Sequence, residues 1–254
     1  MRRTLALLAI STLALLPTSA SAITNGELDG NGHPFVGMLA FYDGPNGTGN
    51  YLHRCTGTLM SATVVLTASH CTDGSQSARV YFTPTVPEDF RSVPGGVVGT
   101  SYTHPDYNPN TLKNDVGVVV LNVGQPGPYP TLPSESFLSR LKRQHQLQDD
   151  TFVAVGYGGQ TSWPPPNLIF ELDRRVSVSP YGSLTQEKLH LTQNPNPSGA
   201  GGTCFGDSGG PHFWKNTLKV VSVTSWGDAI CRSNDMTQRI DTASALDFLA
   251  GFGL

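Results

Sequence analysis

The segment 201–211, which reads GGTCFGDSGGP, constrains this chain more than any other part of its sequence. It places Ser208 directly after Asp207 and among glycines, which open backbone conformations closed to other residues and leave no side chain in the way. The N–H groups around Ser208 can therefore converge on one point and stabilise an oxyanion. A stretch of this kind also occurs as a plain flexible turn, so other motifs must decide between the two interpretations.

Two further segments place a histidine and an aspartate beside apolar runs. His70 follows the β-branched run 63–67, and Asp115 precedes the apolar run 116–121. Alone, each has an ordinary interpretation, as a hydrogen-bonded histidine or a turn aspartate. With Ser208 they give the order His, Asp, Ser, which is one of the chain orders of the Ser-His-Asp catalytic triad.

On these motifs the chain resembles the trypsin/chymotrypsin-like serine proteases, from about Ile23 to the C-terminus. The matching motifs are TASHC around His70, NDVGVVVL around Asp115, GDSGGP around Ser208 and SWG at 225–227. Ser69 and Gly117 stand where many relatives have alanine, but both residues are small and leave the triad intact.

The resemblance implies a role for each site residue. Ser208 would be the nucleophile that forms an acyl-enzyme, His70 its general base and Asp115 the carboxylate that orients the imidazole. The backbone N–H groups of Gly206 and Ser208 would form the oxyanion hole. Three residues would hold the substrate, with its backbone paired as a β-strand: Ser225, Trp226 and Gly227.

Two residues give opposite expectations for the side chain that precedes the cleaved bond, P1. Relatives that cut after Lys or Arg carry an aspartate six residues before the serine, where this chain has Gly202. Glycine there favours an apolar or small P1 side chain. The alternative is a basic P1 bound by Asp235, which the resemblance places near the pocket wall, although an exposed loop aspartate is the plainer interpretation.

The N-terminal residues have the pattern of a signal peptide. Arg2 and Arg3 precede the apolar run 5–16, and Ala20-Ser21-Ala22 is a small-residue cleavage site. We therefore expect removal of residues 1–22 and a secreted protein, extracellular or periplasmic. The resemblance further implies that the new amine of Ile23 pairs with Asp207, so that signal cleavage itself would activate the enzyme.

Four cysteines in an exported chain suggest two disulfides, for which three pairings exist. The resemblance selects two of the pairs: Cys55–Cys71 and Cys204–Cys231. The first would brace the loop that carries His70, and the second would hold the Ser208 loop against the segment after Trp226.

Short β-type runs separated by turn residues predict an all-β protein, and 28 glycines and 19 prolines agree with this. We expect strands at 35–42, 55–60, 63–67, 79–82, 116–121, 151–157, 174–178 and 218–226. The resemblance implies a trypsin-like domain at 23–254, made of two antiparallel six-stranded β-barrels and a short C-terminal helix. The expected boundaries are about 23–123 for barrel one, 134–240 for barrel two and 242–252 for the helix, with a linker at 124–133.

Charge and histidine spacing argue against several functions. The net charge is −3, and it becomes −5 once Arg2 and Arg3 are removed, which argues against nucleic acid as a partner. The seven histidines show no paired metal-ligand spacing, so we expect no metal and no cofactor. We expect polypeptide substrates and protein inhibitors as partners, no membrane association after signal removal, and a monomer.

Two other functions are compatible with parts of the sequence. A catalytically inactive pseudoprotease that acts as a binding module is the first alternative, but His70, Asp115 and Ser208 are all present. An esterase of the α/β-hydrolase type is the second, but it requires the order Ser, Asp, His and alternating strands and helices. Neither condition holds, so a serine endopeptidase is the favoured prediction.

Overall fold

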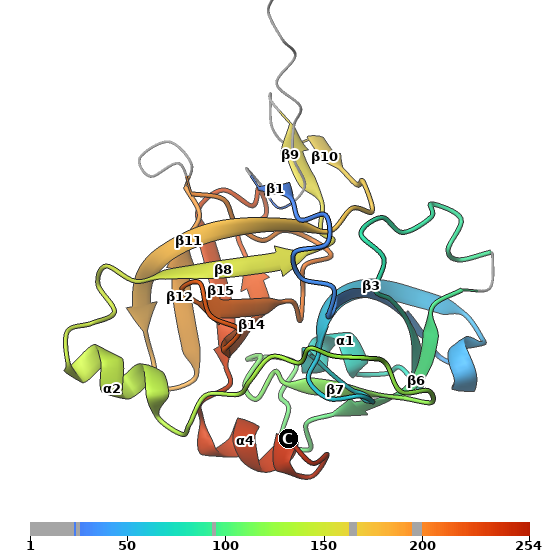
Figure 1. Cartoon of the computed structure of the whole chain (residues 1–254), viewed down its shortest axis with the longest axis horizontal. Coiled ribbons are helices and arrows are strands. Elements are labelled where there is room, and N and C mark those ends of the chain that lie inside the picture. The colour runs from blue at the N-terminus through green and yellow to red at the C-terminus, as the bar shows by residue number, and fades with distance from the viewer. Residues whose placement is uncertain (1–22, 24–25, 93–94, 163–166, 195–199) are drawn as a thin grey trace, which may run out of the picture.

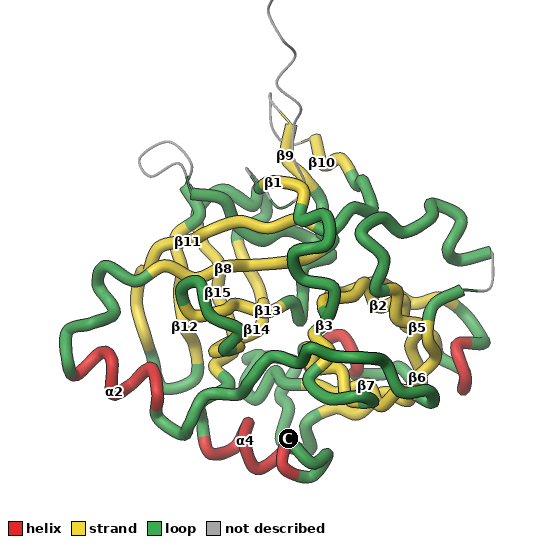
Figure 2. Tube along the Cα trace, in the orientation of Figure 1, coloured by secondary structure: helices red, strands yellow, loops and turns green. Residues whose placement is uncertain are grey.

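The computed structural model describes residue 23 and residues 26–92, 95–162, 167–194 and 200–254. Two β-barrels lie side by side, one built from the first half of the chain and one from the second (Figure 1). Strands and loops make up most of the chain, and its few helices are short (Figure 2). The expected all-β fold of two six-stranded antiparallel barrels with a C-terminal helix is confirmed.

Barrel one is closed, with the strand order β2-β3-β4-β7-β6-β5. Its strands are β2 (Val36–Tyr42), β3 (Tyr51–Leu59), β4 (Val64–Thr67), β5 (Ser77–Tyr81), β6 (Val97–Thr103) and β7 (Gly117–Leu121). Every residue of β2 and β4 is buried, and their apolar side chains form the centre of the core. The central pair of β4 and β7 sets Val65 opposite Val119, so both segments that flank the predicted histidine and aspartate are fixed by one ladder.

Barrel two has the order β11-β12-β15-β14-β13-β8 and closes through a further pairing of β8 with β11. Its strands are β8 (Thr151–Gly156), β11 (Arg175–Leu184), β12 (Lys188–Thr192), β13 (Pro211–Trp214), β14 (Val220–Gly227) and β15 (Asn234–Arg239). Polar side chains are buried in it as well as apolar ones, among them His212, Asp235, Gln193 and Ser179. The short strand β1 (Glu27–Leu28) pairs with β11, and β9 (Gln160–Ser162) forms a separate pair with β10 (Asn167–Ile169).

Arg174 joins the two barrels from a fully buried position. Its guanidinium donates to the backbone oxygens of Val36 and Phe82, which belong to barrel one, and to the carboxylate of Asp29. These charge-assisted bonds satisfy a cation that would otherwise be costly to bury. The relative position of the barrels therefore rests on a specific polar link in addition to apolar packing.

Within the described ranges the helices are η1 (Pro45–Gly47), α1 (Ser69–Thr72), α2 (Phe137–Arg143) and α4 (Ala243–Ala250). Thr242 caps α4 by accepting the N–H of Ala245 at 3.3 Å. From α4, Ser244 donates to the side chain of Asn114, the residue before the predicted catalytic aspartate. None of the helices among the described residues is long and apolar enough to cross a membrane.

Candidate active site

His70 and Asp115 are joined by two hydrogen bonds. His70 lies in α1, directly after β4, and its backbone N–H donates to Asp115 Oδ1 at 2.8 Å. Its ring Nδ1 lies 2.8 Å from Asp115 Oδ2. Because an ionised carboxylate only accepts, Nδ1 carries the proton and Nε2 is left as the acceptor of the neutral ring. This is the tautomer that a general base requires.

Asp115 is fully buried at the junction of the barrels. Barrel two supplies two of its hydrogen bonds: Ser225 Oγ donates to Oδ2 at 2.6 Å, and the N–H of Asp115 donates to Gln238 Oε1 at 3.2 Å. Burial alone would raise the pKa of Asp115, but the hydrogen bonds from His70 and Ser225 outweigh it and lower the pKa. Asp115 is therefore a carboxylate held ionised by its partners.

The Ser208 loop is docked against barrel one. The N–H of Thr56 donates to the carbonyl of Ser208 at 2.8 Å, and the N–H of Gly209 donates to the carbonyl of Thr224 at 2.8 Å. Gly209 has a φ of 75°, and a Cβ there would overlap Thr67 Oγ1. Glycine is required at this position, because the loop approaches the segment before His70 too closely for any side chain.

Both disulfides flank this arrangement. Cys55 in β3 is bonded to Cys71 in α1, next to His70. Cys204 is bonded to Cys231, which ties the Ser208 loop to the turn after β14. These are the two pairs that the resemblance selects.

The loop that carries Ser208 includes the two backbone N–H groups that are expected to form the oxyanion hole. Gly206 has a φ of 102°, a conformation that favours glycine, and its N–H and that of Ser208 donate to no acceptor among the described residues. The described hydrogen bonds also do not join Ser208 Oγ to His70. In uncomplexed enzymes such bonds are often long and tighten only with substrate.

Asp207 is buried and lacks an ion-pair partner among the described residues. Its two oxygens accept the N–H groups of Gly158 at 2.7 Å and Cys204 at 2.9 Å. Burial raises the pKa of Asp207 to about 7, although the two backbone hydrogen bonds oppose the shift. Ile23, its expected partner, is also fully buried. The expected signal peptide, residues 1–22, lies outside the described part of the chain.

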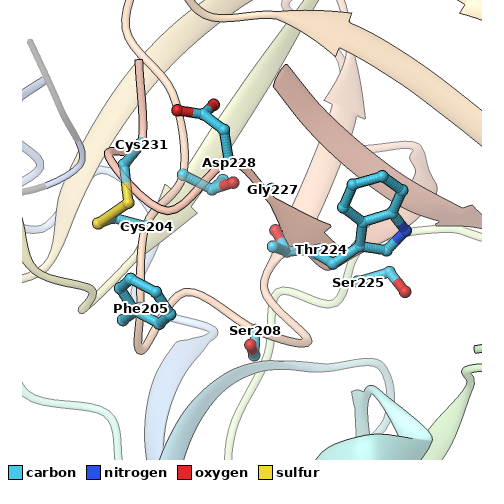
Figure 3. Close-up of a pocket in the computed structure, with 10 residues that line it drawn as sticks. Cys204, Phe205, Ser208, Thr224, Ser225, Gly227, Asp228 and Cys231 are labelled. Atoms are coloured by element: carbon cyan, nitrogen blue, oxygen red, sulfur yellow. A yellow bond between two sulfur atoms is a disulfide. The ribbon is translucent and has the colours of Figure 1, made fainter. Parts of the chain in front are cut away.

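A cavity of about 180 Å³ opens next to Ser208. Its lining residues are Thr203, Cys204, Phe205, Ser208, Thr224, Ser225, Trp226, Gly227, Asp228 and Cys231. Ser208 and Asp228 lie at opposite ends of the residues drawn in Figure 3, with the Cys204–Cys231 disulfide on Asp228's side. The three residues expected to hold the substrate backbone, Ser225, Trp226 and Gly227, thus border the same cavity as the serine.

Neither residue expected to set the P1 preference lines this cavity. Gly202 is buried, and a Cβ at this position would overlap the side chain of Gln193. Asp235 is fully buried, with Oδ2 bonded to His212. The acidic residue on the cavity wall is instead Asp228, which sequence reasoning missed. Its position directly after the SWG motif is the signal that could have found it.

Asp228 is held by the backbone of its own loop. Its carboxylate accepts the N–H groups of Arg232 at 3.1 Å and of Ser233 and Asn234 at 2.8 Å each. Partial burial opposes ionisation, but these bonds outweigh it and lower the pKa of Asp228. Asp228 therefore brings a negative charge to the cavity wall.

The ligand atoms of one group of metal-binding residue types converge within the described part of the chain: Cys55, His70 and Cys71. Both cysteines are committed to their disulfide, so they cannot offer the thiolates that a metal site needs. This cluster is therefore part of the brace around His70.

Comparison with known proteins finds similarity to trypsins and trypsin-like proteases. The trypsin family model matches residues 25–249. The chain is 30% identical to a trypsin of Saccharopolyspora erythraea over 79% of this chain and 84% of that one. It is 28% identical to a trypsin-like protease of Streptomyces glaucescens over 89% of this chain and 82% of that one.

A solved structure of HL collagenase shares the fold, with a TM-score of 0.68 and 20% identity over 91% of this chain and 99% of that one. The family match covers both barrels and every residue of the site described above except Ile23. The chain belongs to the trypsin family and is a serine-type endopeptidase.

Proposed function

We propose that this endopeptidase cleaves polypeptides with His70, Asp115 and Ser208 as its catalytic triad, through an acyl-enzyme. The observation that carries the proposal is the double bond of His70 to Asp115, through the backbone N–H and ring Nδ1 at 2.8 Å each. It leaves Nε2 as the lone-pair nitrogen of the ring, while Thr56 anchors the Ser208 loop to the barrel that carries His70.

In the proposed reaction, Ser208 Oγ attacks the substrate carbonyl while its proton passes to His70 Nε2. The N–H groups of Gly206 and Ser208 stabilise the resulting oxyanion. His70 then gives the proton to the leaving amine as the peptide C–N bond breaks, which leaves an ester on Ser208. Water then attacks this ester while His70 takes its proton, and His70 returns the proton to Ser208 Oγ as the ester C–O bond breaks and the carboxylic acid product leaves.

The proposed P1 preference is for apolar or small side chains. The cavity wall carries the apolar Phe205 and the Cys204–Cys231 disulfide. Gly202 stands where relatives that cut after Lys or Arg have an aspartate, so it offers no carboxylate to a basic P1 side chain. A basic P1 is the alternative, and the observation that favours it is Asp228 rather than Asp235, because Asp228 lies on the cavity wall.

Activation is proposed to follow from signal cleavage before Ile23. Asp207 supports this, because a buried carboxylate whose pKa is raised to about 7 is stabilised by a cation brought to it. The amine of Ile23 would supply that cation. Secretion, a monomeric state and inhibition by proteins are proposed with it; the disulfides are compatible with an oxidising compartment.

The decisive experiment is active-site labelling of the secreted enzyme with a fluorophosphonate. The wild type should be labelled on Ser208, and Ser208→Ala should lose both the label and peptide hydrolysis. Ser222→Ala, in the buried interior of barrel two, is the matched serine control and should retain the label. A folded wild type that takes no label would favour the pseudoprotease alternative.

A further inference from the structure

Lys188 is a buried lysine at the start of β12, and the roles proposed above do not use it. A tight turn fixes its position: Lys188 N–H donates to Thr185 Oγ1 at 2.9 Å, and Thr185 N–H donates to the carbonyl of Lys188 at 2.9 Å. Across the ladder, Lys188 is opposite Gln238 in β15. With 9% of its surface exposed, its side chain lies within the protein.

Three acceptors surround the Lys188 ammonium. Nζ lies 2.6 Å from the carbonyl of Leu112, 3.0 Å from Ser225 Oγ and 3.0 Å from Gln238 Oε1. Leu112 belongs to the loop before Asp115, so this cation also connects barrel two to barrel one. Lysine here fills a position between the two elements that hold the catalytic aspartate.

Counting protons shows that Lys188 is charged. The carbonyl of Leu112 and Gln238 Oε1 can only accept, and the single proton of Ser225 Oγ is donated to Asp115. All three contacts of Nζ therefore need a proton from Lys188, and only the ammonium form has three.

Lys188 and Asp115 are connected through two intervening side chains. Ser225 accepts from Lys188 and donates to Asp115 Oδ2, while Gln238 Oε1 accepts from both Lys188 and the N–H of Asp115. His70 donates to the same Oδ2. The donors thus point from the ammonium through the hydroxyl to the carboxylate, an arrangement in which each bond strengthens the next.

We propose that Lys188 is a positioning residue of the triad, whose charge acts through the Ser225 hydroxyl to hold Asp115 ionised and oriented and to disfavour protonation of His70 Nε2. The proposal rests on the catalytic roles proposed above. Its consequence is activity that persists to lower pH, because a cation near the imidazole opposes a second positive charge there.

The other titratable groups around this cluster leave its charge pattern simple. Burial lowers the pKa of Lys188, and the negative charges of Asp115 and Glu187 oppose that shift. Burial raises the pKa of Tyr107, which faces Asp115, to about 12. Burial also lowers the pKa of His53, which faces His70. Tyr107 and His53 are therefore neutral at pH 7, and the charges that act on Lys188 are those of Asp115 and Glu187.

The test compares Lys188→Gln, which keeps hydrogen-bond donors but removes the charge, with Lys188→Met, which removes both. Lys219→Gln is the matched control, because Lys219 is a half-exposed lysine just before β14, at the opposite end of that strand from Ser225. For each variant, kcat/KM is measured from about pH 4 to about pH 9 and fluorophosphonate labelling at the plateau confirms an assembled site.

Both Lys188 variants should move the acid limb of the pH profile to higher pH by about half to one unit, while Lys219→Gln should not move it. At a pH below the limb this is a loss of about three- to ten-fold relative to the plateau. A merely structural lysine would lower kcat/KM by the same factor at every pH, and that result would overturn the proposal.

The methionine variant provides a second test if Lys188→Gln does not fold, because its unbranched, flexible side chain can fill the space of the lysine stem without burying a new polar group. An acid limb of Lys188→Met that coincides with the wild type refutes the role of Lys188. An unlabelled wild type instead refutes the proposed triad, so the two failures are distinguishable.

Discussion

His212 and Asp235 face each other in the interior of barrel two, with Nε2 of the histidine 2.9 Å from Oδ2 of the aspartate. Both side chains are fully buried, and they come from β13 and β15, which lie on either side of β14. The carboxylate of Asp235 is therefore committed to the barrel interior. Asp235 therefore belongs to the interior of barrel two, while Asp228 lies on the wall of the cavity next to Ser208.

Asp235→Ala should destabilise the protein without a selective effect on P1. The substitution leaves the buried Nε2 of His212 without its hydrogen-bond partner, and an unsatisfied buried polar group typically costs about 1–3 kcal/mol. Urea unfolding of inactivated enzyme would measure this loss. If Asp235→Ala instead keeps the wild-type stability and loses only cleavage after Lys or Arg, Asp235 binds the P1 side chain.

Asp207 should make the uncleaved chain less stable as the pH rises. Its folded pKa of about 7 exceeds the ordinary value of 3.8, so the folded state binds more protons than the unfolded state between these values and loses stability as the pH rises through that window. The full penalty, on the order of 4 kcal/mol, is present above pH 7. The test is urea unfolding of the uncleaved chain and of its Asp207→Asn variant at pH about 4 and about 8. The loss of unfolding free energy between the two pH values should be larger for the wild type than for the variant.

A free amine at Ile23 should abolish this pH dependence, because an ammonium partner offsets the buried carboxylate. The mature enzyme is therefore expected to be stable at pH 8, and Asp207→Asn should lose most of its activity while His70 and Asp115 remain paired. N-terminal sequencing of the active secreted enzyme supplies the check on the partner. A start at any residue other than Ile23 would contradict this route of activation.

Asp115→Asn should lower kcat by about 10⁴-fold and leave the fold intact. The new amide can donate to the imidazole, which then presents a proton instead of a lone pair at Nε2. The exposed Asp247 on α4 provides a matched control, and Asp247→Asn should be as active as the wild type. Steady-state kinetics with one peptide substrate decides the matter, and equal losses in both variants would argue against a catalytic Asp115.

A library of peptides that differ only at P1 should show faster cleavage after apolar or small residues than after Lys or Arg, by about ten-fold or more in kcat/KM. Asp228→Asn should change this ranking little. If Lys and Arg are preferred instead, and Asp228→Asn removes that preference, the ionised carboxylate on the cavity wall determines specificity. Either ranking is read directly from initial rates.

The sequence gives more specific signals for the residues of the proposed site than for the strands. The segments around His70, Asp115 and Ser208 are short, contain residues with few alternative uses and stand in a diagnostic order. The expected strands at 35–42 and 116–121 are also present, as β2 and β7, because barrel one buries continuous apolar runs.

In barrel two, strands β12 and β15 were not predicted for one shared reason: both bury charged side chains. β15 contains Asp235 and Arg239, which are both buried, and β12 begins with the buried Lys188. Their polarity is compensated by partners distant in sequence, such as His212 for Asp235, and such compensation is invisible to a local pattern. For the same reason the sequence alone did not indicate Lys188 and Gln238, because their proposed roles depend on contacts with residues distant in the sequence.

The hydrogen bonds to Asp115 can form only late in the synthesis of the chain. Its carboxylate and N–H are completed by Ser225 and Gln238, 110 and 123 residues further along the chain, and the preceding Asn114 is held by Ser244, 130 residues further along. A nascent chain that contains only barrel one therefore has His70 and Asp115 but lacks the barrel-two residues that hold them. If Asp115 acts as proposed, a partial translation product that ends before Gln238 should lack proteolytic activity, because the hydrogen bonds to Asp115 form only when both barrels are present.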